Sequence, residues 1–493
     1  RRSYLDLLFK AAGFSFVPSY WDFTLKTTHP LGSANRLEFL AIGALDKVTF
    51  FNETEDDRYD NSRILSPEQN QYFAGFTWKH FFDAGLLSVT LGRTFVDFRS
   101  QQLAYLDQEQ EIFRSFSKEG ENSLRTNLVW EATPRLELNV GNVTKFASKL
   151  RYDVFVAGET RLDENGNPAP LEVDTSFTAL RNATYLEASY YLTPTLRATL
   201  GMRGTYYDFL DAAFTADPRV GVRWDVGRQT TLTLGAGRYH QAPSYIWLIG
   251  DPSNRVTLDP IRADQVVAGL ERQLRPDTKL QFEVYYKRYG RYPARVFRPQ
   301  AVLAPSGFED ATTDVPFGLE PLTGDATGRS YGAELLVQKR LSEVPFYGLA
   351  SLAVARSEFT SLEGVTRAGA YDGRVIANLV AGWRINRAWE LSGKFRLATG
   401  LPTTPFLEAG PNTGRLDFSQ YNEGPRLPTF HALDVRIDRR WSFRGWQLDV
   451  YLDVQNVYGR KNVSQLRWDF RAGVVEPNES LGVLPSIGVN VEF

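Results

Sequence analysis

The sequence predicts an all-β protein, namely a large antiparallel up-and-down transmembrane β-barrel with about twenty strands. Three observations predict it. Apolar and polar residues alternate in many short segments, short turns alternate with long polar connections, and aromatic residues make up 13% of the chain. No stretch of about 18 consecutive apolar residues occurs, so the sequence offers no candidate transmembrane helix.

The alternation separates two faces on each predicted strand, because successive side chains of a strand point to opposite sides. In residues 446–455, one face carries Trp446, Leu448, Val450, Leu452 and Val454. The other face carries Gln447, Asp449, Tyr451, Asp453 and Gln455. No core can fill the centre of so many strands, so the apolar face is expected to meet lipid and the polar face to enclose water or a plug.

The predicted strands pair into nine hairpins, each joined by a short turn. The turns lie near residues 29–30, 82–85, 133–134, 193–194, 225–227, 275–277, 341–343, 386–387 and 443–445. The long connections are expected at 53–70, 101–121, 148–182, 241–262, 291–327, 359–373, 399–430 and 459–483. Short and long connections should therefore lie at opposite ends of the sheet. A run at 3–10 and a last strand at 484–493 complete the count, and closure into a barrel would remove the exposed edges.

Aromatic residues at strand ends fit the girdles that flank the lipid-facing band of a membrane barrel. They are Tyr20, Trp21, Phe23, Trp78, Phe81, Phe82, Trp383 and Trp389. Outer-membrane lipid is therefore an expected partner.

Composition excludes several functions. Lys+Arg 56 against Asp+Glu 58 leave a net charge of -2, so nucleic acid is not an expected partner. The absence of cysteine excludes disulfides, thiolate metal sites and cysteine nucleophiles. His29, His80, His240 and His431 have no metal-ligand spacing. The acidic run at 53–60 is expected to be a solvated loop. The sequence thus predicts no enzyme and no cofactor, and residues 1–493 are expected to form one barrel domain.

Several segments resemble the β-barrel of TonB-dependent outer-membrane receptors. They are Gly235-Ala-Gly-Arg-Tyr-His-Gln-Ala-Pro-Ser244, Leu258-Asp-Pro-Ile-Arg-Ala-Asp-Gln265 followed by Gly269-Leu-Glu271, Gly328-Arg-Ser-Tyr-Gly-Ala-Glu-Leu-Leu-Val-Gln-Lys-Arg340, Asp453-Val-Gln-Asn-Val-Tyr458 and Ile487-Gly-Val-Asn-Val-Glu-Phe493. Ile261 stands where the family commonly has Glu. The order and spacing of the segments match along essentially the whole chain.

The resemblance implies a barrel of twenty-two strands in the outer membrane of a Gram-negative bacterium. It further implies that two strands and an N-terminal plug domain lie upstream, with an open seam about two strands wide beside residues 3–10. Expected partners are the plug domain, TonB with its inner-membrane energising complex, and an unknown small solute, which the long loops select. The implied function is TonB-coupled import of a scarce solute. The alternative is a passive wide pore or a scaffold barrel in an envelope assembly.

Two groups of residues are candidates for the functional site. The first comprises predicted lumen-facing residues that contact the plug or line the substrate path, or that merely hydrate the lumen: Gln281, Glu283, Lys287, Glu334, Gln338, Asp434, Arg436, Asp438, Asp449, Asp453 and Gln455. The second comprises Arg238, Tyr239 and Gln241, where a strand gives way to a long loop. These three either contact ligand or fix the backbone of that loop.

Overall fold

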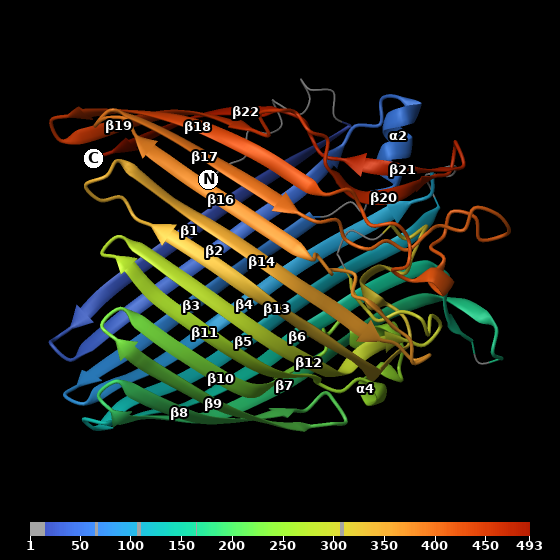
Figure 1. Ribbon diagram of the computed structural model, residues 1–493. Coiled ribbons are helices and arrows are strands. Elements are labelled where there is room, and N and C mark those ends of the chain that lie inside the picture. The colour runs from blue at the N-terminus through green and yellow to red at the C-terminus, as the bar shows by residue number, and fades with distance from the viewer. Residues whose placement is uncertain (1–14, 65–67, 106–109, 164, 306–309) are drawn as a thin grey trace.

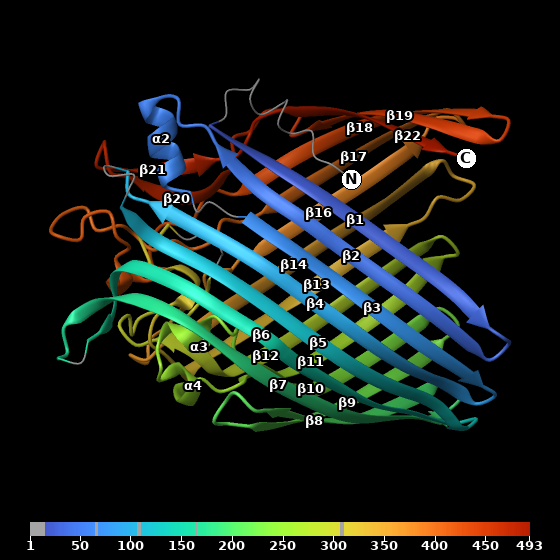
Figure 2. The same cartoon turned by 180° about the vertical axis from the view of Figure 1, so that it is seen from behind.

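A computed structural model describes residues 15–64, 68–105, 110–163, 165–305 and 310–493. The chain forms a tall barrel wall of tilted strands, with short turns at one end and long loops at the other (Figure 1). The view from behind shows the N-terminal strands completing the far side of the same wall (Figure 2). None of the helices in these ranges is long and apolar enough to cross a membrane.

The large sheet has twenty strands in the described ranges, one of which, β15, is only three residues long. They are β1 (Phe16–Leu31), β2 (Asn35–Phe50), β3 (Glu68–Phe82), β4 (Gly85–Leu103), β5 (Glu111–Thr133), β6 (Leu136–Leu162), β7 (Pro168–Thr193), β8 (Leu196–Tyr207), β9 (Phe214–Gly227), β10 (Thr230–Gln241), β11 (Ile261–Arg275), β12 (Thr278–Arg295), β13 (Leu322–Lys339), β14 (Phe346–Thr360), β15 (Thr366–Ala368), β16 (Val375–Arg384), β17 (Trp389–Ala398), β18 (Phe430–Phe443), β19 (Trp446–Gln455) and β22 (Leu484–Glu492).

The smaller elements lie in the long connections. They are α2 (Glu55–Ser62), α3 (Trp247–Gly250), α4 (Asn254–Thr257), η1 (Pro316–Gly318), η2 (Phe418–Gln420) and a separate hairpin of β20 (Val463–Asp469) and β21 (Val474–Glu479).

Every ladder of the large sheet is antiparallel and joins neighbours in sequence, apart from the step from β14 to β16 around β15 and the step from β19 to β22. All nine predicted hairpins are confirmed, from β1–β2 to β18–β19. The first turn was predicted at 29–30 but lies at 32–34, because His29 and Pro30 still pair with β2. The residues of the turns help to explain why the hairpins could be predicted. Gly445, between β18 and β19, has a φ of +92°, a backbone conformation in which a side chain would be strained.

Two predicted loops are largely strand. Residues 101–121 and 148–182 were expected to be long polar connections, but β4 runs to Leu103, β5 starts at Glu111, β6 runs to Leu162 and β7 starts at Pro168. These segments are strand because they pair with each other in register and because apolar residues on them, such as Phe113, Leu150 and Val154, pack against the folded connections. The acidic run at 53–60 is also not a plain solvated loop, because most of it forms helix α2, whose Thr54 and Asp57 make a capping box.

The sheet begins at β1 and ends at β22, and within the described ranges no ladder joins these two outer strands. The predicted strand at 3–10, which was to adjoin an open seam, lies outside the described residues. The relation of that run to residues 484–493 therefore stays a prediction.

The two faces of the wall have opposite chemistry, as the alternation predicted. Leu234, Val266, Val284 and Leu352 are among the exposed apolar residues, which recur at alternate positions of successive strands. In β19, Leu452 is 43% exposed. None of Leu448, Val450, Leu452 and Val454, all described, belongs to a buried core. The apolar side chains therefore form the outer surface of the barrel.

Candidate functional site: the lumen wall and the loop-end cavity

The polar face of the wall is the inner face of the barrel. Side chains on this face reach past a neighbouring strand: the Tyr185 hydroxyl on β7 donates to Asn127 Oδ1 on β5 at 2.5 Å. Arg197 on β8 donates to Glu137 on β6 at 2.9 Å. Contacts that skip a strand suit a concave surface. The inner face is thus a hydrated wall on which charges are mostly paired.

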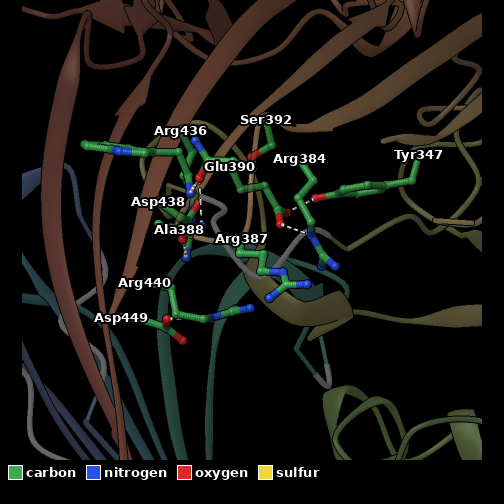
Figure 3. Close-up of a pocket in the computed structure, with 12 residues that line it drawn as sticks. Tyr347, Arg384, Arg387, Ala388, Glu390, Ser392, Arg436, Asp438, Arg440 and Asp449 are labelled. Carbon is green, nitrogen blue, oxygen red and sulfur yellow. Dashed lines mark hydrogen bonds and ion pairs between the residues drawn. The ribbon is translucent and has the colours of Figure 1, made fainter. Parts of the chain in front are cut away.

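A pocket of about 300 Å³ lies on this inner face near the short-turn end (Figure 3). The Nε of Arg436 donates to both carboxylate oxygens of Asp438, to Oδ1 at 3.0 Å and to Oδ2 at 2.9 Å. Arg440 Nε donates to Asp449 Oδ1 at 2.8 Å. Such bidentate or charge-assisted bonds hold the guanidinium groups in fixed planes. The pocket is therefore charged but largely self-satisfied.

Further residues complete the pocket. The Tyr347 hydroxyl bonds the Glu390 carboxylate, which also faces Arg384 at 3.5 Å. Arg387, in the turn between β16 and β17, extends into the pocket (Figure 3) and has no ion pair among the described residues. The sequence prediction missed these four residues, although the alternation of 346–360 and 389–398 could have placed Tyr347 and Glu390 on the inner face.

The predicted lumen-facing residues of β18 and β19 share the inner face. Arg436, Asp438 and Asp449 line the pocket. Asp453 pairs in register with Arg436, and Asp434 lies 3.4 Å from Lys394 Nζ. Gln455 lies two residues after Asp453 on β19, so it points to the same face, and it pairs with Leu484.

The predicted residues of β12 and β13 form a second group, which β14, β16 and β17 separate from the first. Glu283 and Glu334 are directly paired in register, and Gln281 donates to Glu271 at 3.1 Å. Gln338 pairs with Lys279, and the ammonium of Lys287 lies 5.1 Å from the Tyr285 ring centroid. The structure thus brings the predicted residues onto one face but into two clusters. Their contact with a plug or substrate stays a prediction.

The loop-base candidates divide between the two faces. Tyr239 lies on the inner face, stacked under the guanidinium of Arg219 at 4.4 Å. Gln241, at the end of β10, has the same parity. Arg238 has the opposite parity and shares the outer face with Leu234, where its Nε donates to Asp264 at 2.6 Å. Arg238 is therefore a poor candidate for contact with a solute in the lumen.

The long loops are fastened together by a buried ion-pair network. Arg295 Nε donates to Glu320 Oε1 at 2.5 Å, and its two terminal nitrogens donate to Asp314. Arg298 donates to Glu320 at 2.8 Å, and Phe418 from the β17–β18 connection covers both guanidinium groups. Burial alone would raise the pKa of the Asp314 carboxyl, but the two arginines lower it below its usual value.

An apolar core supports the same end of the barrel. Leu248 in α3 and Leu319 in the β12–β13 connection pack with Phe113, Leu150 and other buried residues of the wall. Asn254, fully buried in α4, donates to the carbonyls of Trp247 and Glu320 and accepts from the amide of Leu322. The loop backbone is therefore paired although it is buried.

A second fastening point is the ring of Tyr59 in α2, which is 1% exposed. Its hydroxyl donates to Asp469 at 2.8 Å and accepts from the amide of Phe470 at 2.8 Å. The guanidinium groups of Arg63 and Arg471 cover the ring at 4.4 and 3.9 Å. The β2–β3 and β19–β22 connections are thereby joined.

These fastened loops enclose a cavity of about 630 Å³, the loop-end cavity. Its walls come from the β2–β3, β4–β5, β12–β13, β17–β18 and β19–β22 connections and from the end of β6. The aromatic and charged residues that line it are Tyr59, Arg63, Tyr105, Arg415, Phe470 and Arg471. No Asp or Glu among the described residues lines it. The sequence did not reveal this cavity, because its residues are hundreds of positions apart and follow no periodic pattern.

Histidines do not assemble into a site. His80 bonds Asn35, His240 bonds Asp217 and His431 bonds Tyr458, while the described residues contain no group of three or more potential metal ligands.

The β-barrel model of the family described as "TonB dependent receptor-like, beta-barrel" matches residues 10–457. No curated protein matches the chain. Among solved structures, the chain is similar to the copper transporter OprC, with 13% identity, a TM-score of 0.65 and coverage of 97% of this chain and 72% of that one. It is also similar to the ferric-catecholate import receptor Fiu from K12 E. coli (10% identity, TM-score 0.65, coverage 97% and 75%). A third similar structure is the ferripyoverdine receptor of the Pseudomonas aeruginosa outer membrane (11% identity, TM-score 0.70, coverage 97% and 66%).

Proposed function

Because this chain belongs to the TonB-dependent receptor-like β-barrel family, we propose that it forms the wall of an active importer in the Gram-negative outer membrane. Members of the family are transporters and receptors, not enzymes. In the proposed mechanism, the loop-end cavity captures a scarce solute, and a plug domain in the lumen, moved by TonB, opens a path along the inner face.

The opposite chemistry of the two faces is the observation that carries this proposal. The outer face is apolar, which suits contact with lipid, and the inner face is lined with paired charges, which suits a wet passage or a polar plug surface. On the inner face, many charged side chains form ion pairs with neighbouring strands. These charges do not need a plug to neutralise them. Where the charges are paired in this way, a plug can move against the wall without leaving them unpaired.

The loop-end cavity supports capture of an anionic solute. Arg63 and Arg471 have carboxylate partners, Glu476 and Asp56, whereas Arg415 has no ion pair in the described part of the chain. Tyr105 and Phe470 supply flat apolar surface beside these cations. Arginine recognises carboxylate and other oxyanions through parallel hydrogen bonds, so an anion with an aromatic or other flat portion fits best.

Energy-dependent uptake tests the proposal. The full-length gene product is expressed in cells lacking it, and uptake of 55Fe-labelled ferric catecholate, 55Fe-labelled ferripyoverdine, labelled cobalamin and Cu(II) is measured with and without TonB. Uptake of one probe that stops without TonB is expected. Uptake that continues without TonB would instead support the passive wide pore, and a barrel that transports none of the probes under either condition would contradict the proposed import of these classes.

A point variant locates the capture step. Arg415→Gln is expected to raise the concentration for half-maximal uptake by about tenfold, because it removes a charge-assisted bond. Arg228→Gln, in the turn between β9 and β10 at the other end of the barrel, is the matched control and should change it by less than about twofold. Equal effects of the two substitutions would exclude the loop-end cavity as the capture site.

A further inference from the structure

The outer face carries a row of charged residues that crosses five strands near the long-loop end. Cross-strand pairing places Arg238 beside Asp264, Asp264 beside Arg288, Arg288 beside Arg329 and Arg329 beside Glu358. All five have the parity of the exposed apolar residues of β10–β14. A charge on the lipid-facing side of a barrel is costly in the apolar band, so this row requires an explanation.

Position along the strand shows where the row meets the membrane. On the outer face of β12, Leu280, Phe282 and Val284 are followed by Tyr286 and then Arg288. Arg288 lies ten positions after Thr278, which is at the turn. At about 3.3 Å per residue and a tilt of about 45°, this is a height of about 23 Å, close to the band of about 25 Å that lipid-facing apolar residues occupy. The row therefore lies where acyl chains give way to headgroups.

The layer beneath the row is aromatic, as expected at a membrane interface. Tyr286 and Tyr331 are paired in register, and their rings stack with centroids 6.4 Å apart. Tyrosine rings at this depth fix the height of a barrel in the bilayer. The charged row thus begins one residue pair above the aromatic layer, at the level of lipid phosphates.

The row has an excess of positive charge. Arg238 and Arg262 share Asp264, at 2.6 and 3.3 Å. Arg329 and Arg356 share Glu358, at 2.7 and 3.7 Å. Arg288, at the centre, is exposed and has no carboxylate partner among the described residues. Together with Arg262 and Arg356, which flank it, the row thus has five guanidinium groups and two carboxylates.

A shallow pocket of about 210 Å³ lies at this uncompensated centre. Polar groups that line it besides Glu358 are Tyr286, Arg288, Thr327, Arg329, Thr360 and Thr366. Two guanidinium groups beside several hydroxyl donors suit a tetrahedral oxyanion, whose oxygens accept several hydrogen bonds at once. We propose that this pocket binds the phosphate group of a membrane lipid in the leaflet on the long-loop side.

Native mass spectrometry of the full-length protein in detergent micelles tests this proposal, with phosphatidic acid as the probe and phosphatidylcholine as the reference lipid. The double variant Arg288→Gln, Arg329→Gln is expected to bind phosphatidic acid about tenfold more weakly. Lys287→Gln removes the neighbouring cation on the inner face and should leave binding within about twofold. Glu358→Gln frees two arginines and should strengthen binding.

Folding and ligand source are checked separately. Each variant must keep the gel shift that distinguishes a folded barrel from a heated one, which removes misfolding as a cause of lost binding. Unchanged phosphatidic acid binding in the folded double variant would overturn the proposal, and so would weaker binding in Glu358→Gln. Displacement of the lipid by millimolar inorganic phosphate would also overturn it, because the pocket would then be a site for a soluble anion. None of these results depends on whether the barrel transports a solute.

Discussion

The two ends of the barrel hold their charges in different ways. At the short-turn end, Asp277 bonds Lys339 and Ser342 in a surface turn, where its side chain is 18% exposed. At the loop end, Glu320 is 0% exposed and is paired with Arg295 and Arg298. Breaking a buried pair leaves an uncompensated charge in a poorly hydrated place, whereas water replaces a partner at the surface. The comparison indicates that the long loops are held in fixed positions around the opening of the barrel, here called the preorganised mouth, whereas the turns only reverse the chain.

The largest expected effect is that of Glu320→Ala. It leaves Arg295 and Arg298 without the Glu320 carboxylate beneath Phe418. We therefore expect the free energy of local unfolding of these loops to fall by about 3–5 kcal/mol. Hydrogen exchange of peptides covering 313–322 and 415–424 should accelerate. The barrel strands serve as the internal control, because the exchange of β16–β19 should not change. Slow exchange of both loop peptides in the variant would contradict the preorganised mouth.

Acid should weaken the same network. The arginines lower the pKa of Asp314, so its stabilising contribution is complete above the ordinary carboxyl value of about 3.9 and is lost as the pH falls through the lower folded value. Pepsin cleavage within 310–322 should therefore be slow at about pH 5 and fast near pH 2. In Asp314→Asn, which cannot titrate there, cleavage should already be fast at about pH 5. A wild-type cleavage rate that simply follows pepsin activity would refute this prediction.

Tyr59→Phe should have a smaller effect. It removes one hydroxyl that both donates to Asp469 and accepts from the amide of Phe470, and leaves the ring under its two arginines. The expected loss is about 1–3 kcal/mol, because a buried amide then lacks a partner. Hydrogen exchange at 469–473 should accelerate, while exchange at 313–322 should not. Accelerated exchange of both segments would show that the two fastening points open together.

The two ends also differ in how far the sequence predicted them. All nine hairpins were predicted, because alternation with period two and residues such as Gly445 fix a hairpin locally. The inner face of β18–β19 followed from the same alternation. The loop-end cavity did not, because Tyr59 and Phe470 meet only through packing between connections far apart in sequence. Residues 148–182 were missed as strand although Leu150, Tyr152, Val154 and Val156 alternate there, because these apolar side chains pack against connections that are far away in sequence.

Asp277→Asn should have the smallest effect of all. The Lys339 ammonium and the Ser342 and Thr278 hydroxyls lower the pKa of the Asp277 carboxyl, which they all contact. Because the side chain is partly exposed in a surface turn, water and salt compensate for the lost ion pair, and an amide oxygen still accepts from both hydroxyls. The thermal midpoint of the barrel should not change, and neither should the exchange of 313–322. Because Asp277→Asn and Glu320→Ala each remove one carboxylate from one ion-pair network, a marked fall in the midpoint for the turn variant would show that exposure is not what separates the two ends.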